Sequence, residues 1–482
     1  MLYLNYVTNL CAFTLLCLCV IEANGLHYNI FAYERYNGKI QERQVQTLID
    51  EFTATDIPIE TDTNTKSTTA FVSKSRVKTL AVQQTTPISA SSRTSNSSNY
   101  KIDSITPSTS DPKVTLDLDP KDGICQFTNR RKRPIQLSIS IGLDRKIATT
   151  ESITTWNFSA HNFTNDELLY AALVMLEHTL KMPELEPWRM STESLTGFLL
   201  ASRSAYNAFV PYHNFRHAVD TLQACFIFLI RLGRIPSFPD MKIELSSQSS
   251  TLAETIRPYD ALTLLITAIG HDIGHPGVNN AFLTTLNAPL AQLYNNRSVL
   301  ESFHSVAFSQ MLRCHWPSVF QTKEMRQLMV NTILATDKDL HSEYVKKLAR
   351  INENIISANT SANNSAQLSP GELRTFACAL IMKCADISNV ARNFEIASLW
   401  AVILTDEFSR RVAMGKEMGI SSALLAPPIR EIAALGKSQI DFIETYAYPL
   451  FDGIAEVMPA LSFCVEELMR NKLIWKKLII EN

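Results

Sequence analysis

Three well-separated segments carry the side chains that a divalent metal centre needs. They are YHNFRH (212–217), GHDIGHPG (270–277) and KCADISN (383–389). Imidazole nitrogens and carboxylate oxygens suit zinc and other divalent first-row metals. Two histidines and two aspartates drawn from these segments would form a site with positions left open for water. Six of the ten histidines fall between positions 213 and 315, so they gather where these segments lie.

Helices and helix ends must position these side chains. His213 and His217 are four residues apart, so on a helix they would share one face. His271 and Asp272 are adjacent and can converge on one ion only at a helix end, which the Pro-Gly pair after the second histidine supplies. Asp386 would end an apolar helix, where a carboxylate without a compensating metal would be costly.

Apolar residues recur at helical spacing from about residue 160 onward, with almost no strand-like alternation. Residues 165–167 should begin a helix that runs through Leu180. Further helices are expected near 192–209, 213–232, 259–270, 299–313, 322–335, 339–354, 372–388, 394–412, 428–446 and 450–471, with polar loops at 243–253 and 357–370. The sequence therefore predicts an all-α protein with one multi-helix domain over residues 160–482.

The N-terminal third has a different composition. Residues 61–110 contain 23 Ser or Thr in 50 positions and few large apolar side chains, so they cannot bury enough surface to offset the entropy of ordering. We expect an N-terminal segment over 1–53, a disordered Ser/Thr-rich linker over 54–120 and a connecting segment over 121–159. The apolar run Leu10–Ile21 is too short to span a bilayer.

Charge and cysteine usage limit the partners and the compartment. The 45 basic and 47 acidic residues give a net charge of −2, which argues against binding to nucleic acid. The nine cysteines form no CxxC pair, which is typical of a cytoplasmic protein. The alternative is a secretory or membrane-associated protein, with Leu10–Ile21 as signal peptide or membrane contact. No feature indicates an oligomeric state.

The motifs YHNFRHAVD, IGHDIGHPGVNN, ATDKDLH and KCADISN together resemble those of the class I cyclic-nucleotide phosphodiesterases, a branch of the HD-type metal phosphohydrolases. In detail they are most similar to the fungal high-affinity cAMP enzymes. The resemblance covers about residues 160–482 and implies a compact all-helical catalytic domain. It also implies hydrolysis of cAMP, and of cGMP as a further candidate substrate, to the 5′-monophosphate.

The resemblance implies two divalent ions and a histidine acid. A first ion, usually zinc, would be bound by His217, His271, Asp272 and Asp386. A second, usually magnesium or manganese, would share Asp272. Its waters would be held by His275, Glu301, His304 and Thr336. The nucleophile would be a water activated by both ions. His213 would protonate the leaving 3′ oxygen, oriented by a C-terminal glutamate for which Glu466 and Glu467 are the candidates.

The resemblance also implies a base pocket. Gln439 would pair with the purine edge and Phe442, three residues later, would stack on the base. The opposite wall would be Leu404 with Phe408 behind it. Tyr212 and Asn389 would complete the substrate-binding residues.

Two departures from the family pattern bear on selectivity. Gly274 stands where many relatives carry a second aspartate, as it does in the fungal group. Residues 409–415 (SRRVAMG) replace a Gln-Gly-Asp-like stretch, so the pocket lip beside residues 418–424 should differ. Two alternatives are another HD-type nucleotide phosphohydrolase and a catalytically silent cyclic-nucleotide-binding scaffold. The first predicts no Gln439–Phe442 pair, and the second predicts a lost ligand or a lost His213.

Overall fold

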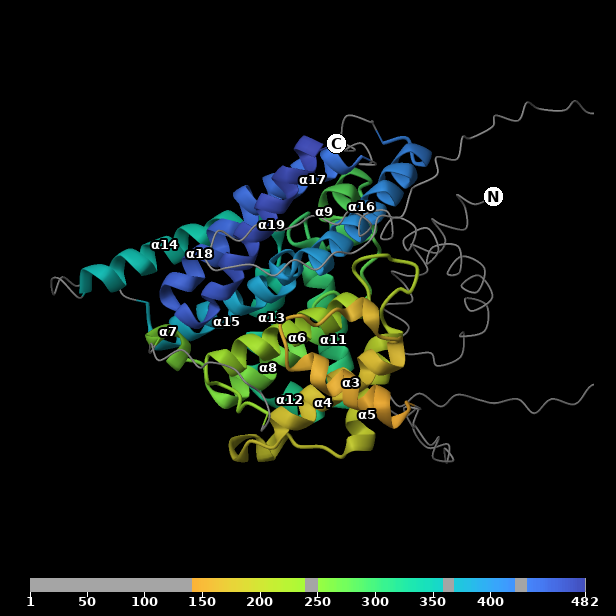
Figure 1. The fold of residues 1–482 in the computed structure, drawn as a ribbon. Helices are drawn as coiled ribbons and strands as arrows, with labels where there is room; N and C mark the ends of the chain where they lie inside the picture. Colours follow the sequence, from red (N-terminus) through yellow and green to blue (C-terminus); the bar gives the residue numbers. More distant parts are fainter. Residues whose placement is uncertain (1–140, 239–249, 359–367, 421–430, 482) are drawn as a thin grey trace, which may run out of the picture. The chain divides into compact units, whose positions relative to one another are not determined.

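The computed structural model describes residues 141–238, 250–358, 368–420 and 431–481 (Figure 1). Within these ranges the chain forms helices and turns and no strand, so the predicted all-α class is confirmed. The segments 1–53 and 54–120, with the apolar run and the expected linker disorder, lie outside the described residues. So do residues 121–140 and most of the two expected loops. No helix in the described ranges combines the length and the apolarity that a membrane span requires.

The described chain begins with helices that pack against one another in sequence order. They are α3 (Leu143–Ile153), α4 (Asn165–Leu180) and α5 (Thr192–Ser204). Thr164 begins α4 through a capping box with Glu167. Trp156 lies in the stretch that we expected to be a connecting segment. Its indole Nε1 donates to the Ala391 carbonyl at 2.8 Å, so this part of the stretch packs onto the helical domain.

Four contacting helices form the centre of the domain, and their ends carry site residues. They are α6 (Phe215–Arg231), α8 (Pro258–Gly270), α13 (Lys323–Ala335) and α15 (Pro370–Asp386). Residues 217–230, 260–270 and 376–385 of α6, α8 and α15 are buried without interruption, which is the pattern of helices surrounded by others. His217 lies in the first turn of α6, His271 directly follows α8, and Asp386 ends α15.

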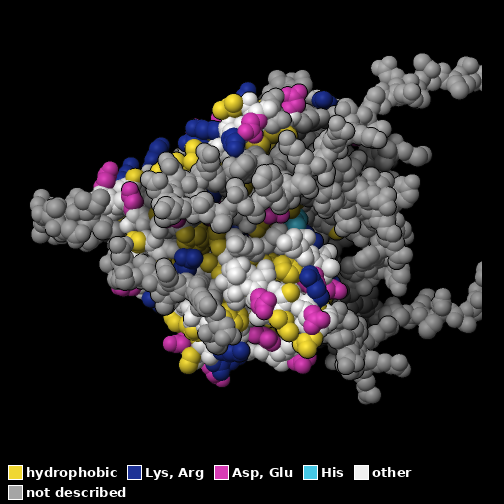
Figure 2. Space-filling model, viewed as in Figure 1, with side chains coloured by type: hydrophobic (Ala, Val, Ile, Leu, Met, Phe, Trp, Pro, Cys, Tyr) yellow, Lys and Arg dark blue, Asp and Glu magenta, His cyan; other side chains and the backbone are white. Residues whose placement is uncertain are grey.

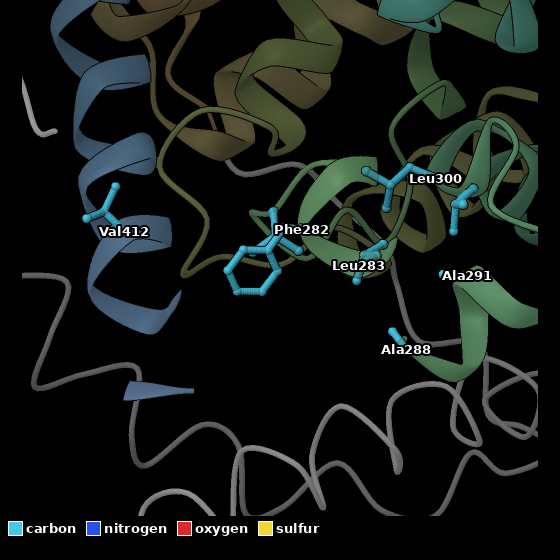
Figure 3. Packing of buried hydrophobic residues seen from close by; sticks show 8 residues of the cluster. Phe282, Leu283, Ala288, Ala291, Leu300 and Val412 are labelled. Atoms are coloured by element: carbon cyan, nitrogen blue, oxygen red, sulfur yellow. The ribbon is translucent and has the colours of Figure 1, made fainter. Parts of the chain in front are cut away.

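Three short helices and one of 17 residues join this centre to a long helix on the other side of the site. They are α9 (Asn280–Thr285), α10 (Pro289–Leu293), α11 (Val299–His315) and α12 (Pro317–Gln321), and the long helix is α16 (Phe394–Glu417). Figure 3 shows Phe282 and Leu283 of α9 between Val412 of α16 and Leu300 of α11, all within one buried apolar cluster. This cluster fixes α16 relative to the segment that follows the His-Asp turn. The sequence pattern did not predict α9, α10 or α12, because helices of one or two turns show too little periodicity.

The C-terminal helices differ from the predicted runs at two points. These helices are α14 (His341–Ala358), α17 (Ile432–Phe442), α18 (Tyr448–Val457) and α19 (Ser462–Glu481). The single turn α7 (Thr251–Glu254) lies earlier in the chain, before α8. A π-helical turn, Ile443–Ala447, separates α17 from α18. The predicted 450–471 helix is interrupted at Pro459, which begins a 3₁₀ turn between α18 and α19. Helices α17 and α18 both pack on α19 (Figure 1).

Acidic and basic side chains are interspersed on the face of the described residues that Figure 2 shows. Figure 2 shows lysine, arginine, aspartate and glutamate side chains among apolar ones over the same helices. In this view they do not separate into regions of one sign, in keeping with the net charge of −2.

Candidate metal centre and active site

Two imidazoles and two carboxylates meet where the central helices end. One ligand atom each from His217, His271, Asp272 and Asp386 lies within 4.8 Å of all the others. The Asp386 Oδ1 atom lies 3.0 Å from Nε2 of His217 and 3.3 Å from Nε2 of His271. The Asp272 Oδ2 atom lies 3.3 Å from the same nitrogen of His271 and 3.6 Å from that of His217. The structure thus brings together the four residues predicted from three separate motifs.

Local helix chemistry explains how His217 is placed. Asn214 caps α6 by accepting from the backbone N–H groups of Arg216 and His217. The helix therefore begins at Phe215 rather than at 213, and His213 lies in the turn before it. The i, i+4 spacing still places the two rings close, with centroids 5.9 Å apart.

The turn after α8 is equally specific. A Cβ atom on Gly270 would approach the Phe308 ring to 2.2 Å, so the helix can pass α11 only with glycine there. Gly274 has a left-handed φ of 74°, which glycine adopts without steric cost. The departure from an aspartate at this position therefore has a backbone reason in this chain.

The protonation of the cluster suits a cation. Burial opposes ionisation of Asp272 and Asp386, but the facing imidazoles outweigh burial and hold the pKa of both carboxyls below the ordinary value. His271 places Nδ1 3.0 Å from the Ala268 carbonyl, which holds a proton on Nδ1, while the two carboxylates outweigh burial and raise the pKa of this histidine, so that a metal ion bound here would replace the proton on Nε2. The donor set, two imidazole Nε2 atoms and two carboxylate oxygens, therefore fits a divalent first-row metal.

The residues predicted to hold metal-bound waters adjoin this cluster in part. His304 places Nδ1 2.7 Å from the Ile273 carbonyl, and its buried Nε2 lies 3.7 Å from Asp272 Oδ1 without a hydrogen-bond partner. Burial raises the pKa of Glu301 to about 7, and the carboxyl accepts from Asn280 at 2.9 Å. The backbone N–H of Gly277 donates to His275 Nδ1. Thr336 caps α13 and donates to the Ile333 carbonyl, a contact that does not connect it to the cluster.

A glutamate on α16 holds His213, and it is not one of the two that we expected. Glu407 Oε1 lies 2.5 Å from His213 Nδ1, and its Oε2 accepts from the backbone N–H groups of Tyr212 and His213. The expectation of Glu466 or Glu467 is therefore wrong. Glu466 is exposed on α19, and Glu467 pairs with Arg470 on the same helix. A sequence signal existed: Glu407 follows Leu404 by three residues, so it lies on the same helical face.

This pairing sets the charge of His213. Burial by itself lowers the pKa of His213, but the Glu407 carboxylate outweighs it, and the pKa is raised to about 9. Burial also opposes ionisation of Glu407, yet His213 lowers its pKa to about 2. The His213 ring lies flat against the His275 ring, with centroids 4.0 Å apart.

The predicted base-pocket residues lie on elements that adjoin one another. Leu404 and Phe408 are on α16, and Gln439 and Phe442 are on α17, which contacts α16. Gln439 is buried and Phe408 is 38% exposed. Asn389 lies in the turn after α15 and donates to the Tyr212 hydroxyl at 2.5 Å.

The divergent residues 409–415 place an arginine against this pocket. The guanidinium of Arg411 lies 4.5 Å from the centroid of the Phe408 ring, a cation–π contact. Of the expected pocket lip at 418–424, residues 421–424 lie outside the described residues.

An all-helical domain with a His-Asp ligand set at converging helix ends is the arrangement of the HD-type metal phosphohydrolases, as the motifs indicated. A sequence model of the family described as 3′5′-cyclic nucleotide phosphodiesterase matches residues 212–468. The chain belongs to this family.

Individual relatives agree with the family match. The chain is 28% identical over 356 residues to the 3′,5′-cyclic-nucleotide phosphodiesterase 2 of Saccharomyces cerevisiae, covering 67% of this chain and 60% of that protein. It is 29% identical over 327 residues to a cGMP-specific 3′,5′-cGMP phosphodiesterase 3 of Dictyostelium discoideum, covering 66% and 62%. The crystal structure of yeast caPDE2 superposes with a TM-score of 0.59 at 32% identity, covering 70% of this chain and 69% of that one. The chain thus spans about 60% of the length of the two curated relatives.

Proposed function

We propose that this chain hydrolyses 3′,5′-cyclic nucleotides to 5′-monophosphates, with cAMP as the preferred substrate and cGMP as the second. The observation that carries the proposal is the adjacency of a His213–Glu407 pair to a four-residue ligand cluster. Family membership supports the reaction class, and the relatives include both cAMP and cGMP enzymes by name. A silent scaffold would have no use for a half-buried histidine held by a buried glutamate beside a ligand cluster.

The metal assignments are part of the proposal. His217, His271, Asp272 and Asp386 would hold a first ion, which we infer to be zinc. Asp272 would share a second ion, which we infer to be magnesium or manganese, with His275, Glu301, His304 and Thr336 around its waters. Divalent ions at this place supply Lewis-acid chemistry, which lowers the pKa of a bound water and neutralises phosphate charge. The unpartnered Nε2 of His304 beside Asp272 supports a polar occupant there.

His213 is the group that completes the reaction. Its Nδ1 is bonded to Glu407, so the proton that it transfers must leave from Nε2. As the P–O3′ bond breaks and a water oxygen bonds to phosphorus, that proton passes to O3′ and gives a neutral hydroxyl. The raised pKa keeps His213 protonated at neutral pH, which is the state that a general acid needs.

The base would bind between α16 and α17. The Gln439 amide offers one donor and one acceptor to the purine edge, Phe442 offers an aromatic face, and Leu404 with Phe408 forms the other wall. Tyr212 and Asn389, already bonded to each other, would contact the substrate beside them. The amide can present either polarity, so cAMP preference depends on how Gln439 is held.

Turnover of cAMP and cGMP side by side, with and without a chelator, tests the proposal. We expect hydrolysis of cAMP with the higher kcat/KM, loss of activity on chelation, and recovery with Zn²⁺ plus Mg²⁺ or Mn²⁺. Nucleotide binding without turnover under every metal condition would identify a scaffold. Turnover of nucleoside monophosphates in place of cyclic nucleotides would identify another HD-type phosphohydrolase.

Replacing Glu407 by glutamine should change the pH dependence of turnover. The glutamine removes the charge that raises the pKa of His213, while burial still lowers that pKa, so the acid loses its proton at lower pH. The ratio of variant to wild-type kcat should therefore be highest in acidic buffer and fall as pH rises. The wild-type kcat should decline at basic pH with an apparent pKa of about 9, and the variant's kcat should decline with a lower apparent pKa. A pH profile of kcat for both proteins measures this. Glu467→Gln on α19 is the matched control, and an equal shift in that control would contradict the assignment.

We also propose a cytoplasmic location. Five cysteines fall in the described part of the chain, and all five are free thiols, four of them buried. Reduced cysteines are typical of the cytoplasm. Fractionation of a C-terminally tagged protein, with a glycosidase mobility assay, would show a secretory location if the alternative were correct.

A further inference from the structure

A column of three aromatic rings leads away from the proposed base-stacking residue. Phe442 and Tyr446 are stacked with centroids 5.1 Å apart and an interplanar angle of 22°. Tyr446 and His341 are stacked more closely, at 3.5 Å and 15°. The three residues come from the end of α17, the π-helical turn and the start of α14. Tyr446 therefore lies between Phe442 and His341, a residue more than one hundred positions earlier in the sequence.

Tyr446 lies in the π-helical turn that directly follows Phe442. In a regular α-helix, residues four apart are offset by about 40° around the axis. The π-helical turn changes this offset, and in this chain the two rings lie stacked. Pro449 has no N–H group to donate to the carbonyl four residues back, so the regular hydrogen-bond ladder is already interrupted here. The wide turn is thus a local property of this sequence that favours the stack.

His341 forms the fixed end of the column. Its side chain is buried, with the residue only 6% exposed, and burial followed by the Lys383 charge lowers its pKa to about 4. It is therefore neutral at physiological pH. Neither ring nitrogen makes a hydrogen bond of normal geometry to a described residue, although the backbone of Tyr446 lies nearby. Its stacking on Tyr446 is one contact that positions this ring.

The other groups around Tyr446 connect it to the reaction site. Lys338, two residues after Thr336, places Nζ 5.8 Å from the centroid of the tyrosine ring. Burial first, and then the charges of Asp386 and Asp337, raise the pKa of Tyr446, so its hydroxyl stays protonated. Tyr446 thus lies near the ligand cluster while its ring faces Phe442.

We propose that Tyr446 is a positioning residue that sets the orientation of the Phe442 ring, and with it the affinity of the base pocket. The inference rests on the proposed function, because Phe442 is assigned there as the stacking residue. A purine must stack on Phe442 and reach the Gln439 amide, one turn earlier on α17, at the same time. Without the Tyr446 ring stacked on it, the Phe442 ring can rotate. The base then loses its stacking on Phe442 when it hydrogen-bonds to Gln439, or loses those hydrogen bonds when it stacks. The reacting phosphate, near His213, is affected less.

The test compares Tyr446 with Tyr344, a second tyrosine whose ring is stacked on another aromatic ring. Tyr446→Leu removes the stacked ring, and Tyr446→Phe removes only the hydroxyl. The control is Tyr344→Leu, whose ring stacks on Phe376 at 5.7 Å and 10° with Lys383 Nζ 5.1 Å from its centroid. The full chain is assayed for kcat, KM and thermal midpoint, and calorimetry gives the Kd for cAMP and for AMP.

We expect Tyr446→Leu to raise KM and Kd about 3- to 10-fold, the size of one lost aromatic pair, with kcat within about twofold of wild type. Tyr446→Phe should behave as wild type, and Tyr344→Leu should change the thermal midpoint without changing KM. An unchanged KM in Tyr446→Leu, a fall in kcat alone, or an equal rise in KM in Tyr344→Leu would overturn the inference. A wild-type protein that binds nucleotide without turnover, with weaker binding in Tyr446→Leu, would refute the proposed function and leave this inference standing. Absence of nucleotide binding in the wild type would refute both.

Discussion

Replacing His213 by alanine should lower kcat for cAMP by ~10²–10⁴-fold and leave nucleotide affinity nearly unchanged. The 3′ oxygen is a poor leaving group unless it is protonated as the P–O bond breaks. In this chain His213 is the group prepared for that step, because Glu407 fixes its Nδ1 and keeps the ring charged. Alanine removes the proton donor and keeps the ligand cluster.

A substrate that needs no acid separates this role from a structural one. In a phosphodiester that carries a p-nitrophenyl group, p-nitrophenolate departs without being protonated. His213→Ala should therefore retain much more of the wild-type rate on this substrate than on cAMP. The control is His178→Ala, which removes a half-buried histidine whose Nε2 contacts the Pro236 carbonyl. Equal losses on both substrates, or unchanged turnover of cAMP, would remove His213 from the role of general acid.

The residues alone predicted a centre of two histidines and two aspartates at helix ends, and the resemblance to the phosphodiesterases selected which four residues form it. Three of the central helices, α6, α8 and α15, are buried along most of their length, and His217, His271 and Asp386 lie where those buried runs begin or end. Because these helices pack against one another, the residues at their ends lie close together. The four residues that the resemblance implied as ligands come together in the structure, with one ligand atom each within reach of one ion.

Sequence reasoning failed where a partner is set by packing between distant helices. Glu407 is 194 positions from His213, and it reaches that residue because the Phe282–Val412 cluster holds α16 in place. Glu466 and Glu467 have the right residue type, yet α19 turns one toward solvent and pairs the other with Arg470. The π-helical turn was also missed, since Phe442 and Tyr446 have ordinary α-helical spacing in the sequence. The first failure concerns which faces of distant helices meet, and the second concerns a local change of helix type; apolar periodicity contains neither.

Replacing Asp386 by asparagine should remove bound metal and abolish most activity. Its Oδ1 faces the Nε2 atoms of both His217 and His271, at 3.0 and 3.3 Å, so it is central to the four-donor set. Asparagine keeps the volume and removes the charge, which leaves the imidazoles with one carboxylate and a neutral amide. Loss of a ligand should weaken metal binding by more than the ~10–100-fold that outer-shell changes cause. Since the metal contributes several kcal/mol to catalysis, kcat/KM should fall by ~10³-fold or more.

Metal content measured on gel-filtered protein tests this ligand set without reference to activity. We expect the wild type to carry metal that a chelator removes with a fall in thermal midpoint, and Asp386→Asn to carry at least one equivalent less and to respond weakly to chelator. Asp406→Asn is the matched control, because this aspartate pairs with Arg410 on the outer part of α16 and should keep the full metal content. An Asp386→Asn protein that retains both ions would exclude Asp386 as a ligand. Since this carboxylate ends an apolar helix, such a result would also require another source of compensation for its charge.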